Sequence, residues 1–459
     1  MSVDTVIAGG TLVTASGTRE GALAIDDGEI VGVGDEAALP EGDEHIDATG
    51  DLVMPGIVDP HVHIGDHVSI DSYETATRAA ALGGVTTVID FAWQAYAGDE
   101  SPWDEPAPLL DGVEEKRANE AEALIDFGLH GGILREDDDL FEEMGDVVEA
   151  GITSFKMYTA YDYGLSNGFM GRVFEHLADH GAVGLVHSED DSVCEARVED
   201  LRAAGRDEPE AYPESRPDYA EAMAAEDAVR LASEAGAKYY GIHTTARASA
   251  EVMDRFREDG SRVRAETCVH YTTLDDAVYA EQGNLPKIAP PIRAPDDVEA
   301  MFEYLRRGVL SVVSTDHVAS KRADKTDRPW WEGPFGANGI QRSLPVFHDE
   351  AVSERGLSYP FLVRVMSANP AETFGMPRKG TLDPGTDADI VVFDPDATHT
   401  ITADENASRA DYSIYEGRGV TGRVRKTFVR GELVADDGAI VADPGHGEFL
   451  ERSIPAWET

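Results

Sequence analysis

The stretch Gly56-Ile57-Val58-Asp59-Pro60-His61-Val62-His63 is a short apolar run, typical of a buried strand, that ends in two histidines. In extended backbone, side chains two positions apart point to the same side, so His61 and His63 can bind one metal ion together. Many His-x-His pairs are incidental, and this pair alone does not establish a metal site. Other apolar runs that end in polar residues recur along the chain and strengthen this interpretation.

Eight short apolar runs alternate with helical stretches rich in Glu and Ala. This alternation indicates a parallel sheet covered by helices. Eight strand–helix units are what a closed (β/α)8 barrel of the TIM type needs, and its reactive groups lie at the carboxyl ends of the strands. We therefore predict an α/β fold whose barrel strands lie at residues 56–62, 85–91, 123–134, 154–157, 182–186, 237–242, 263–268 and 309–314.

The two ends of the chain differ from the middle. They contain short alternating runs of strand type at residues 5–8, 23–25, 30–33, 389–393, 427–430 and 439–441. Gly-containing turns separate these runs, and Asp436-Asp437-Gly438 is typical of a β-hairpin. We expect the two ends to pair into one β-structure.

The chain has 459 residues, with 38 basic and 89 acidic side chains, which gives a formal net charge of −51. A field of this sign repels nucleic acid and anionic lipid, so neither is expected as a partner. We interpret the charge as adaptation to a salt-rich, halophilic cytoplasm, where salt screens the repulsion; a specific cationic partner is the alternative.

The chain contains no stretch of ~18 apolar residues that could span a membrane and no N-terminal secretion signal, so we expect a cytoplasmic protein. Acidic residues 99–105 are expected to form an exposed loop over the barrel mouth.

Four further strands end in residues that could join the two histidines at the predicted catalytic rim, namely Lys156, His187, His243 and Asp316. Each has an ordinary structural interpretation. A buried lysine can extend towards solvent, a lone histidine is usually a core residue, and an aspartate after a strand often caps the next helix. Their coincidence at strand ends favours a metal site, because divalent ions such as zinc prefer imidazole and carboxylate ligands.

Lys156 is the exception in this set, because an ammonium group cannot bind a metal. Burial beside cations would lower its pKa and leave a nucleophilic amine, which can take up carbon dioxide as a carbamate. A carbamate is a bidentate anion that can bridge two ions ~3.5–4 Å apart, the usual spacing in two-metal hydrolytic sites. We therefore predict two divalent metal ions, with zinc the favoured metal, and an N6-carboxylated Lys156.

This set of residues resembles the ligand pattern of the dihydropyrimidinase and hydantoinase branch of the amidohydrolase superfamily. The resemblance covers nearly the whole chain and includes Met54-Pro55-Gly56-Ile57-Val58-Asp59, Val88-Ile89-Asp90-Phe91, Asp126-Phe127-Gly128-Leu129-His130, Glu266-Thr267-Cys268, Lys379-Gly380-Thr381 and Gly385-Thr386-Asp387-Ala388-Asp389. In this family the last element opens the C-terminal part of a composite β-sandwich. The resemblance therefore implies a sandwich of residues 1–53 plus 381–459 and a metal-dependent barrel of residues 54–380.

The resemblance also implies roles for the site residues. It implies that one ion is held by His61, His63 and Asp316, the other by His187 and His243, and that carboxylated Lys156 bridges the two. Asp316 would accept a proton from the attacking water and return it to the leaving nitrogen. Tyr161 would donate a hydrogen bond to the developing oxyanion; the less favoured alternative is an ordinary aromatic residue of the barrel rim. Family members commonly form homotetramers or dimers, so we expect a homo-oligomer.

The implied substrate is a small cyclic amide or ureide, such as a dihydropyrimidine or a 5-substituted hydantoin. Dihydroorotases usually place an arginine two residues after the His-x-His pair, where this chain has Gly65. Dihydropyrimidinases commonly carry a serine where this chain has Ala289, and an alanine there is similar to allantoinases. If the serine hydroxyl is needed to hold the ring, a different ring is favoured. Asn338 stands where the branch often has a ring-binding asparagine. An allantoinase-like or dihydroorotase-like activity is the alternative.

Two functions of other classes compete with this prediction. A non-catalytic scaffold of the same fold would have lost metal ligands, whereas all six are present here. Amine deaminases of the superfamily usually have a mononuclear site without a bridging lysine, so Lys156 argues against that reaction. A metal-dependent hydrolase of cyclic amides is therefore the predicted function.

Overall fold

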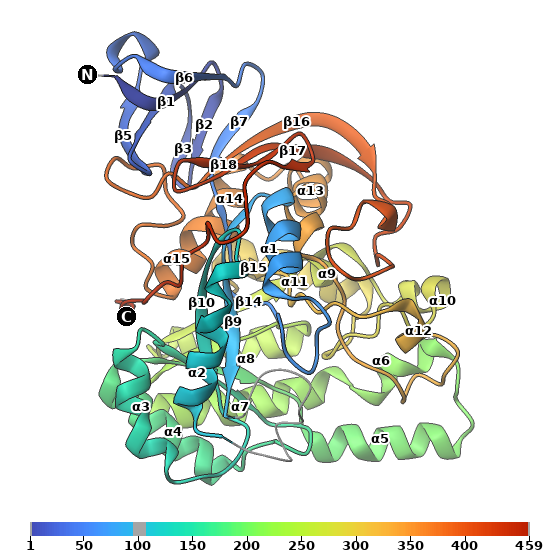
Figure 1. Ribbon diagram of the computed structural model, residues 1–459. Coiled ribbons are helices and arrows are strands. Elements are labelled where there is room, and N and C mark those ends of the chain that lie inside the picture. Colours follow the sequence, from blue (N-terminus) through green and yellow to red (C-terminus); the bar gives the residue numbers. More distant parts are fainter. Residues whose placement is uncertain (1, 95–106, 458–459) are drawn as a thin grey trace.

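The sheet at the centre of the molecule contains eight parallel strands in the spatial order β15-β14-β13-β12-β11-β10-β9-β8. Figure 1 labels four of them, β9, β10, β14 and β15, in the middle of the molecule. The strands are β8 (Ile57–Asp59), β9 (Val85–Trp93), β10 (Asp126–Gly132), β11 (Ser154–Tyr158), β12 (Val183–His187), β13 (Lys238–Gly241), β14 (Val263–Cys268) and β15 (Val312–Ser314). The computed structural model describes residues 2–94 and 107–457. It confirms the predicted (β/α)8 barrel.

The first and last barrel strands meet at a seam that is closed by hydrogen bonds. His63 N–H donates to the carbonyl oxygen of His317 at 2.9 Å. The buried carboxylate of Asp59 accepts two further bonds from Thr315, one from the hydroxyl at 2.5 Å and one from the backbone N–H at 3.2 Å. The seam therefore places the polar residues that follow β8 beside those that follow β15.

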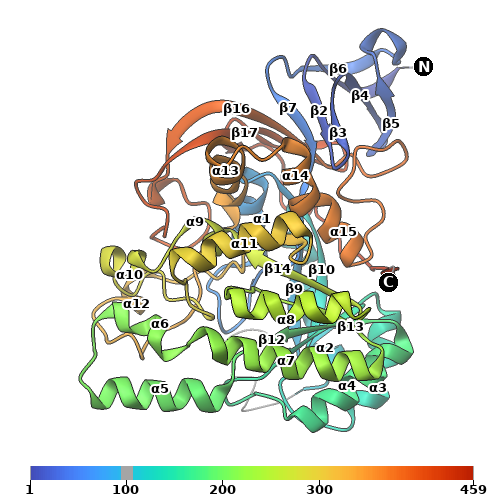
Figure 2. The same ribbon diagram turned by 180° about the vertical axis from the view of Figure 1, so that it is seen from behind.

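Helices cover the outside of the barrel (Figures 1 and 2). Those that connect successive barrel strands are α1 (Tyr73–Leu82), α2 (Leu109–Arg117), α3 (Leu140–Glu149), α4 (Asn167–His180), α5 (Asp191–Ala203), α6 (Tyr212–Ser215), α7 (Asp218–Ala235), α8 (Arg247–Glu258), α9 (Val269–Thr273), α10 (Ala277–Gln282) and α11 (Pro295–Arg307). After β15 follow α12 (Arg322–Lys325), α13 (Ser343–His348), α14 (Tyr359–Val363) and α15 (Asn369–Thr373). Helix α4 has clear local signals: the hydroxyl of Ser166 caps its start, and Gly181, with a φ of +66°, ends it.

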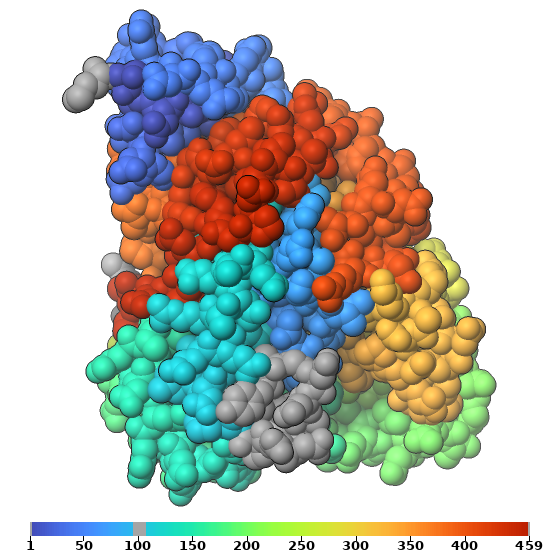
Figure 3. All heavy atoms as spheres, viewed as in Figure 1, coloured from blue at the N-terminus to red at the C-terminus, as the bar shows by residue number. Residues whose placement is uncertain are grey.

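The two ends of the chain form two further sheets. The first contains β1 (Val3–Ala8), β4 (Ala22–Asp26), β5 (Glu29–Gly34) and β6 (Gly42–Asp47). The second contains β2 (Thr11–Thr14), β3 (Gly17–Glu20), β7 (Leu52–Pro55), β16 (Ile390–Thr400), β17 (Gly419–Val429), β18 (Glu432–Asp436) and β19 (Ala439–Ile440). Strands β7 and β16 pair antiparallel, with Leu52 opposite Phe393, and Figure 3 shows the N-terminal module (blue) in contact with the C-terminal segment (orange to red). The domain boundaries at residues 53/54 and 380/381 stay a prediction.

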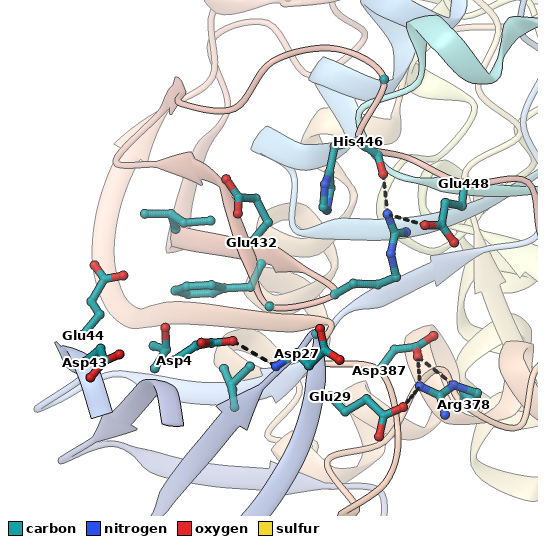
Figure 4. Close-up of a pocket in the computed structure, with 18 residues that line it drawn as sticks. Asp4, Asp27, Glu29, Asp43, Glu44, Arg378, Asp387, Glu432, His446 and Glu448 are labelled. Atoms are coloured by element: carbon teal, nitrogen blue, oxygen red, sulfur yellow. Dashed lines mark hydrogen bonds and ion pairs between the residues drawn. The ribbon is translucent and has the colours of Figure 1, made fainter. Parts of the chain in front are cut away.

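A cleft of about 1030 Å³ lies where the first sheet meets the C-terminal strands. Figure 4 shows carboxylates from both ends of the chain around it. One cation joins the two ends: Arg378 Nη2 lies 2.9 Å from Glu29 and 2.5 Å from Asp387. Electrostatic pairing therefore supports the association of the chain ends beside their shared sheet.

The observed barrel strands differ from the predicted ones mainly at their ends. The third strand is expected at 123–134, whereas β10 is shorter. A 3-10 helix ends at residue 122, and the buried residues 123–125 connect it to β10. The predicted loop at 99–105 lies outside the described residues. No helix within the ranges 2–94 and 107–457 is both long and apolar enough to cross a membrane.

Candidate metal centre

One cavity at the carboxyl ends of the barrel strands, with a volume of about 270 Å³, contains most of the predicted site residues. Those that line it are His61, His63, Lys156, Tyr161, His187, His243, Ala289 and Asp316. Asn338 is also buried, but it is not among the described residues of the lining. Five barrel strands therefore direct their terminal side chains to one place, as the barrel geometry predicts.

Three of these residues form a compact group of potential metal ligands, namely His61, His63 and Asp316. Their donor atoms lie within 4.8 Å of one another, and Asp316 Oδ1 is 3.2 Å from His61 Nε2 and 3.5 Å from His63 Nε2. Within the described ranges, the buried Nε2 of His61 has no hydrogen-bond partner. A buried nitrogen without a partner costs free energy unless another group binds it. A divalent cation fits this set of two imidazoles and one carboxylate.

His187 and His243 form a second pair next to this group. Nδ1 of His187 lies 2.9 Å from Nε2 of His243, and the stacked rings of His243 and His61 have centroids 5.3 Å apart. Nε2 of His187 lies 2.9 Å from the carboxylate of Glu189, to which it donates its proton. The lone pair of His187 Nδ1 is therefore directed at His243, so that the two nitrogens can bind a second ion together.

Lys156 is buried in β11 within electrostatic reach of both groups. Burial lowers its pKa to about 8. Burial, with a smaller contribution from the charge of Lys156, also lowers the pKa of His187 and His243. Lys156 Nζ lies 4.9 Å from the ring centroids of Phe91 and Tyr158. The loss of solvation on burial disfavours the ammonium form of Lys156 at this position.

A buried carboxylate fixes the orientation of the first histidine. Glu266 Oε1 lies 2.6 Å from His61 Nδ1 and accepts a hydrogen bond from the backbone N–H of His243 at 3.1 Å. The hydroxyl of Tyr240 donates to the other oxygen of Glu266 at 2.9 Å. Because His61 Nδ1 carries the proton towards Glu266, its Nε2 faces the site as a lone pair, the arrangement that outer carboxylates give to metal-binding histidines.

If this cavity binds a divalent metal ion such as zinc, we expect Glu266→Gln to weaken that binding by about 10- to 100-fold, the usual effect of removing such an outer partner. Glutamine keeps the shape of the side chain but loses the charge that strengthens the bond from His61. Competition with a chromogenic chelator measures the affinity. Tyr240→Phe removes only the hydroxyl on the other oxygen of Glu266 and is the matched control, with a smaller expected effect. Equal zinc affinity of Glu266→Gln and the unaltered protein would contradict this role.

Several site residues have an unusual backbone conformation. Seven non-glycine residues in the described part of the chain have a positive φ, and three of them are Tyr161 (+72°), His243 (+35°) and Asp316 (+46°). Such conformations cost free energy and persist where the surrounding structure enforces them, often at functional sites. At Tyr161 the enforcing contact is a hydrogen bond from its backbone N–H to the Asp191 carboxylate at 2.9 Å. The strain favours a functional role for the cavity.

The remaining walls of the cavity are largely apolar or aromatic. They include Val68, Tyr158, Tyr163, Val318, Pro334 and Phe335. Apart from the histidines, Lys156 is the only basic residue among the described lining residues. A small, mostly uncharged ring suits these walls, whereas a substrate carboxylate would find no arginine in the lining.

Sequence analysis missed two residues that support the second histidine pair. Arg216 contacts the carboxylate of Glu189, and its guanidinium carbon lies 5.4 Å from the ring centroid of Tyr161. Burial raises the pKa of Glu189, but the charge of Arg216 and the hydrogen bond from His187 together outweigh it and hold this pKa below its usual value. Glu189 stands two residues after His187, so its position at a strand end was a signal, but Arg216 lies in a connecting segment and no local pattern indicates its role.

Comparison with known proteins gives consistent matches over the whole chain. The model of the amidohydrolase family matches residues 52–434. A D-hydantoinase of Streptomyces coelicolor is 35% identical over 473 residues, which cover 99% of each chain. An allantoinase of Escherichia coli is 32% identical over 453 residues, which cover 95% of this chain and 96% of the relative. The crystal structure of dihydropyrimidinase from Brevibacillus agri NCHU1002 superposes with a TM-score of 0.92 at 30% identity, over 99% of this chain and 100% of that one.

Proposed function

Because this chain belongs to the amidohydrolase family and is a hydrolase of cyclic amides, we propose that its substrate is a hydantoin or a dihydropyrimidine and that two bound metal ions assist the reaction. The observation that carries the proposal is the convergence of six potential ligand residues from five barrel strands on one small cavity. The names of the similar D-hydantoinase and dihydropyrimidinase support the choice of ring.

The donor atoms divide naturally between two ions. We assign His61, His63 and Asp316 to one ion, His187 and His243 to the other, and a carboxylated Lys156 to both. The carbamate forms when the neutral amine adds to carbon dioxide, with a new N–C bond and the loss of one proton. Zinc is the proposed metal, because a borderline ion suits imidazole and carboxylate donors. When bound, such ions polarise the amide carbonyl and lower the pKa of water towards neutrality.

Two side chains of the cavity supply the remaining chemistry. Although burial disfavours the charged form, the neighbouring histidines hold the pKa of Asp316 well below its usual range, so it is ionised at neutral pH. Asp316 therefore accepts the proton of the attacking water and returns it to the ring nitrogen as the C–N bond breaks. Burial raises the pKa of Tyr161 well above its usual range, which keeps its hydroxyl protonated. Tyr161 can thus donate a hydrogen bond to the developing oxyanion.

Tyr161→Phe is expected to lower kcat by about 10²- to 10³-fold, the effect of removing one oxyanion donor, with little change in KM. Steady-state kinetics on the best substrate measures both constants. Tyr412→Phe is the matched control, because that buried tyrosine contacts Ser320 and does not line the cavity. A kcat of Tyr161→Phe within about twofold of the unaltered enzyme would exclude the oxyanion role, because so small a change leaves the activation free energy almost unaltered.

A substrate panel tests the proposed function. Purified protein reconstituted with zinc is assayed in concentrated KCl on a 5-substituted hydantoin, dihydrouracil, allantoin and dihydroorotate. We expect the highest kcat/KM for the hydantoin or dihydrouracil. Absence of turnover for every member of the panel would contradict the proposal.

Allantoin is the second candidate substrate, and Ala289 is the observation that favours it. This residue lines the cavity but has no hydroxyl to offer to a ring, and the Escherichia coli relative is named an allantoinase. Dihydroorotate is disfavoured, because its carboxylate would meet no arginine among the described lining residues. The ratio of kcat/KM for allantoin and hydantoin decides between the two candidates.

We also propose that the enzyme works as a homo-oligomer in a salt-rich cytoplasm. The net charge of −51 supports the high-salt setting. At high salt concentration the screening length falls to a few Å, so the carboxylates repel one another only weakly. Sedimentation and activity measured across a KCl series test both parts of this proposal.

A further inference from the structure

The C-terminal segment, residues 444–457, leaves the sheets and runs along the amino ends of the barrel strands, opposite the cavity. Phe127 N–H donates to the carbonyl of Glu448 at 3.0 Å, and Leu450 N–H donates back to Phe127 at 2.8 Å. Further along, Arg452 N–H donates to the carbonyl of Gly151 at 3.1 Å. Residues 448–452 therefore lie against the amino-terminal end of the barrel, beside the starts of β10 and β11.

The side chain of Arg452 points from this segment into the barrel. The residue is 5% exposed, and burial lowers its pKa to about 9. Its Nη2 donates to the carbonyl oxygen of Leu129 in β10 and, at 2.8 Å, to the hydroxyl oxygen of Ser154 in β11. Gly128 leaves room for it, since a Cβ at that position would lie 3.2 Å from Arg452 Cδ and Nε.

The hydrogen bonds continue from Ser154 to the residue before the first metal-ligand candidate. His130 Nδ1 lies 2.6 Å from Ser154 Oγ, and His130 Nε2 lies 2.8 Å from the carbonyl oxygen of Pro60. A carbonyl only accepts, so Nε2 carries the proton of the neutral ring, and Nδ1 accepts. Burial, with help from the charge of Arg452, holds the pKa of His130 well below its usual value, which keeps the ring neutral.

Every donor in this chain of bonds is therefore determined. Arg452 donates to Ser154, Ser154 donates to His130, and His130 donates to Pro60. Aligned hydrogen bonds polarise one another and strengthen the whole series, most of all in a buried setting. The guanidinium at its start donates hydrogen bonds and accepts none, which fixes the direction of the series.

We propose that Arg452 is a positioning residue for the metal centre, which it supports from the barrel floor through Ser154 and His130. The series ends on the carbonyl of Pro60, one residue before His61. Ser154 lies two residues before Lys156 in the same strand, so the two side chains share the inner face of β11. The series thus holds the backbone of one ligand candidate and contacts the strand of another.

The ring of His130 adds a packing contact to the same site. Its centroid lies 5.1 Å from that of Phe91, which in turn stacks on His63 at 4.8 Å. A displaced or rotated His130 would therefore disturb both histidines of the pair that follows β8. This inference rests on the proposed metal centre, and its test separates the two.

The test compares Arg452→Met, Arg452→Lys, Ser154→Ala and the double variant Arg452→Met/Ser154→Ala in the full-length protein. Methionine matches the aliphatic part of the arginine side chain and is apolar, so the C-terminal segment can still dock near Phe374, whose ring centroid lies 5.9 Å from the guanidinium carbon. Lys238→Met is the matched control. Lys238 is a second buried cation of the barrel floor and donates to the carbonyls of Gly181 (2.7 Å) and Pro455 (2.5 Å), but it has no bond to Ser154.

We expect Arg452→Met and Ser154→Ala each to weaken zinc binding about tenfold, as loss of an outer support does, and the double variant to be no weaker than either. Arg452→Lys should recover part of the affinity, and Lys238→Met should lower Tm without changing zinc affinity. Chelator competition and thermal unfolding provide these readouts. Unchanged affinity in Arg452→Met, or an equal loss in Lys238→Met, would overturn the inference alone. Failure of the unaltered protein to bind zinc would overturn the proposed metal centre together with it.

Discussion

For the proposed two-zinc site, replacement of Lys156 by alanine is expected to reduce bound zinc from two equivalents to one or fewer, and to lower kcat/KM by more than about 100-fold, the upper end for loss of an outer partner of a ligand. Lys156 is the one ligand candidate whose unmodified side chain cannot bind a metal, yet it is buried within electrostatic reach of both histidine groups. Alanine would remove the proposed carbamate and leave the proposed second ion with two imidazoles. Metal analysis and steady-state kinetics measure the two effects.

The cavity left by the alanine allows a sharper version of this experiment. Formate or acetate can occupy the space of the lost carbamate, so either anion should restore part of the zinc content and activity of Lys156→Ala. Lys379→Met is the control, because Lys379 is also buried but pairs with Asp126 and Asp389 at the junction of barrel and sheet. It should lose stability and keep its zinc. A Lys156→Ala protein with two equivalents of zinc and normal kcat would contradict the role of Lys156.

Asp316→Asn is expected to lower kcat by about 10²- to 10⁴-fold, the contribution of a positioned general base. Asparagine has the same shape and can still offer an oxygen to a metal, but it cannot accept a proton from water at neutral pH. The loss should therefore appear in kcat more than in KM. Steady-state kinetics with zinc in excess separates this effect from weaker metal binding.

Asp349→Asn is the matched control for Asp316→Asn. Asp349 is similarly buried, accepts a hydrogen bond from the backbone N–H of Thr421 at 3.0 Å, and does not line the cavity. Its replacement should lower Tm and leave kcat unchanged. If Asp316→Asn kept its kcat at saturating zinc, another group would have to move the proton.

The barrel could be predicted from sequence because a parallel strand buried on both faces is a continuous apolar run. Each of the eight barrel strands lies inside its predicted run or extends beyond it by at most two residues. The largest difference in length between a predicted run and its strand is at β10. The chain ends were harder. The predicted hairpin at Asp436-Asp437-Gly438 is confirmed, because Asp436 pairs with Ala439. The first half of β17 contains too many polar residues and glycines to be recognised as a strand.

The residues that line the cavity were accessible for the same reason, since they stand where apolar runs end. His61, Lys156, His187, His243 and Asp316 all follow or terminate predicted strands. Their roles as ligands stay predictions until metal is measured.

The residues that support the cavity from outside could not be foreseen. Arg216 reaches Glu189 from a connecting segment, and Arg452 enters the barrel from the end of the chain, 298 residues away from its partner Ser154. Such contacts depend on the path of the whole backbone, and no local periodicity encodes them. Sequence patterns therefore identified the side chains at the cavity surface and missed those that hold them in place.

Anomalous diffraction at the zinc edge from crystals of the reconstituted enzyme tests the metal centre most directly. We expect two peaks about 3.5–4 Å apart, one against His61, His63 and Asp316 and the other against His187 and His243, with continuous density from Lys156 Nζ to a carboxylate between them. A single peak with an unmodified lysine side chain, or no zinc among these residues, would contradict the two-metal site.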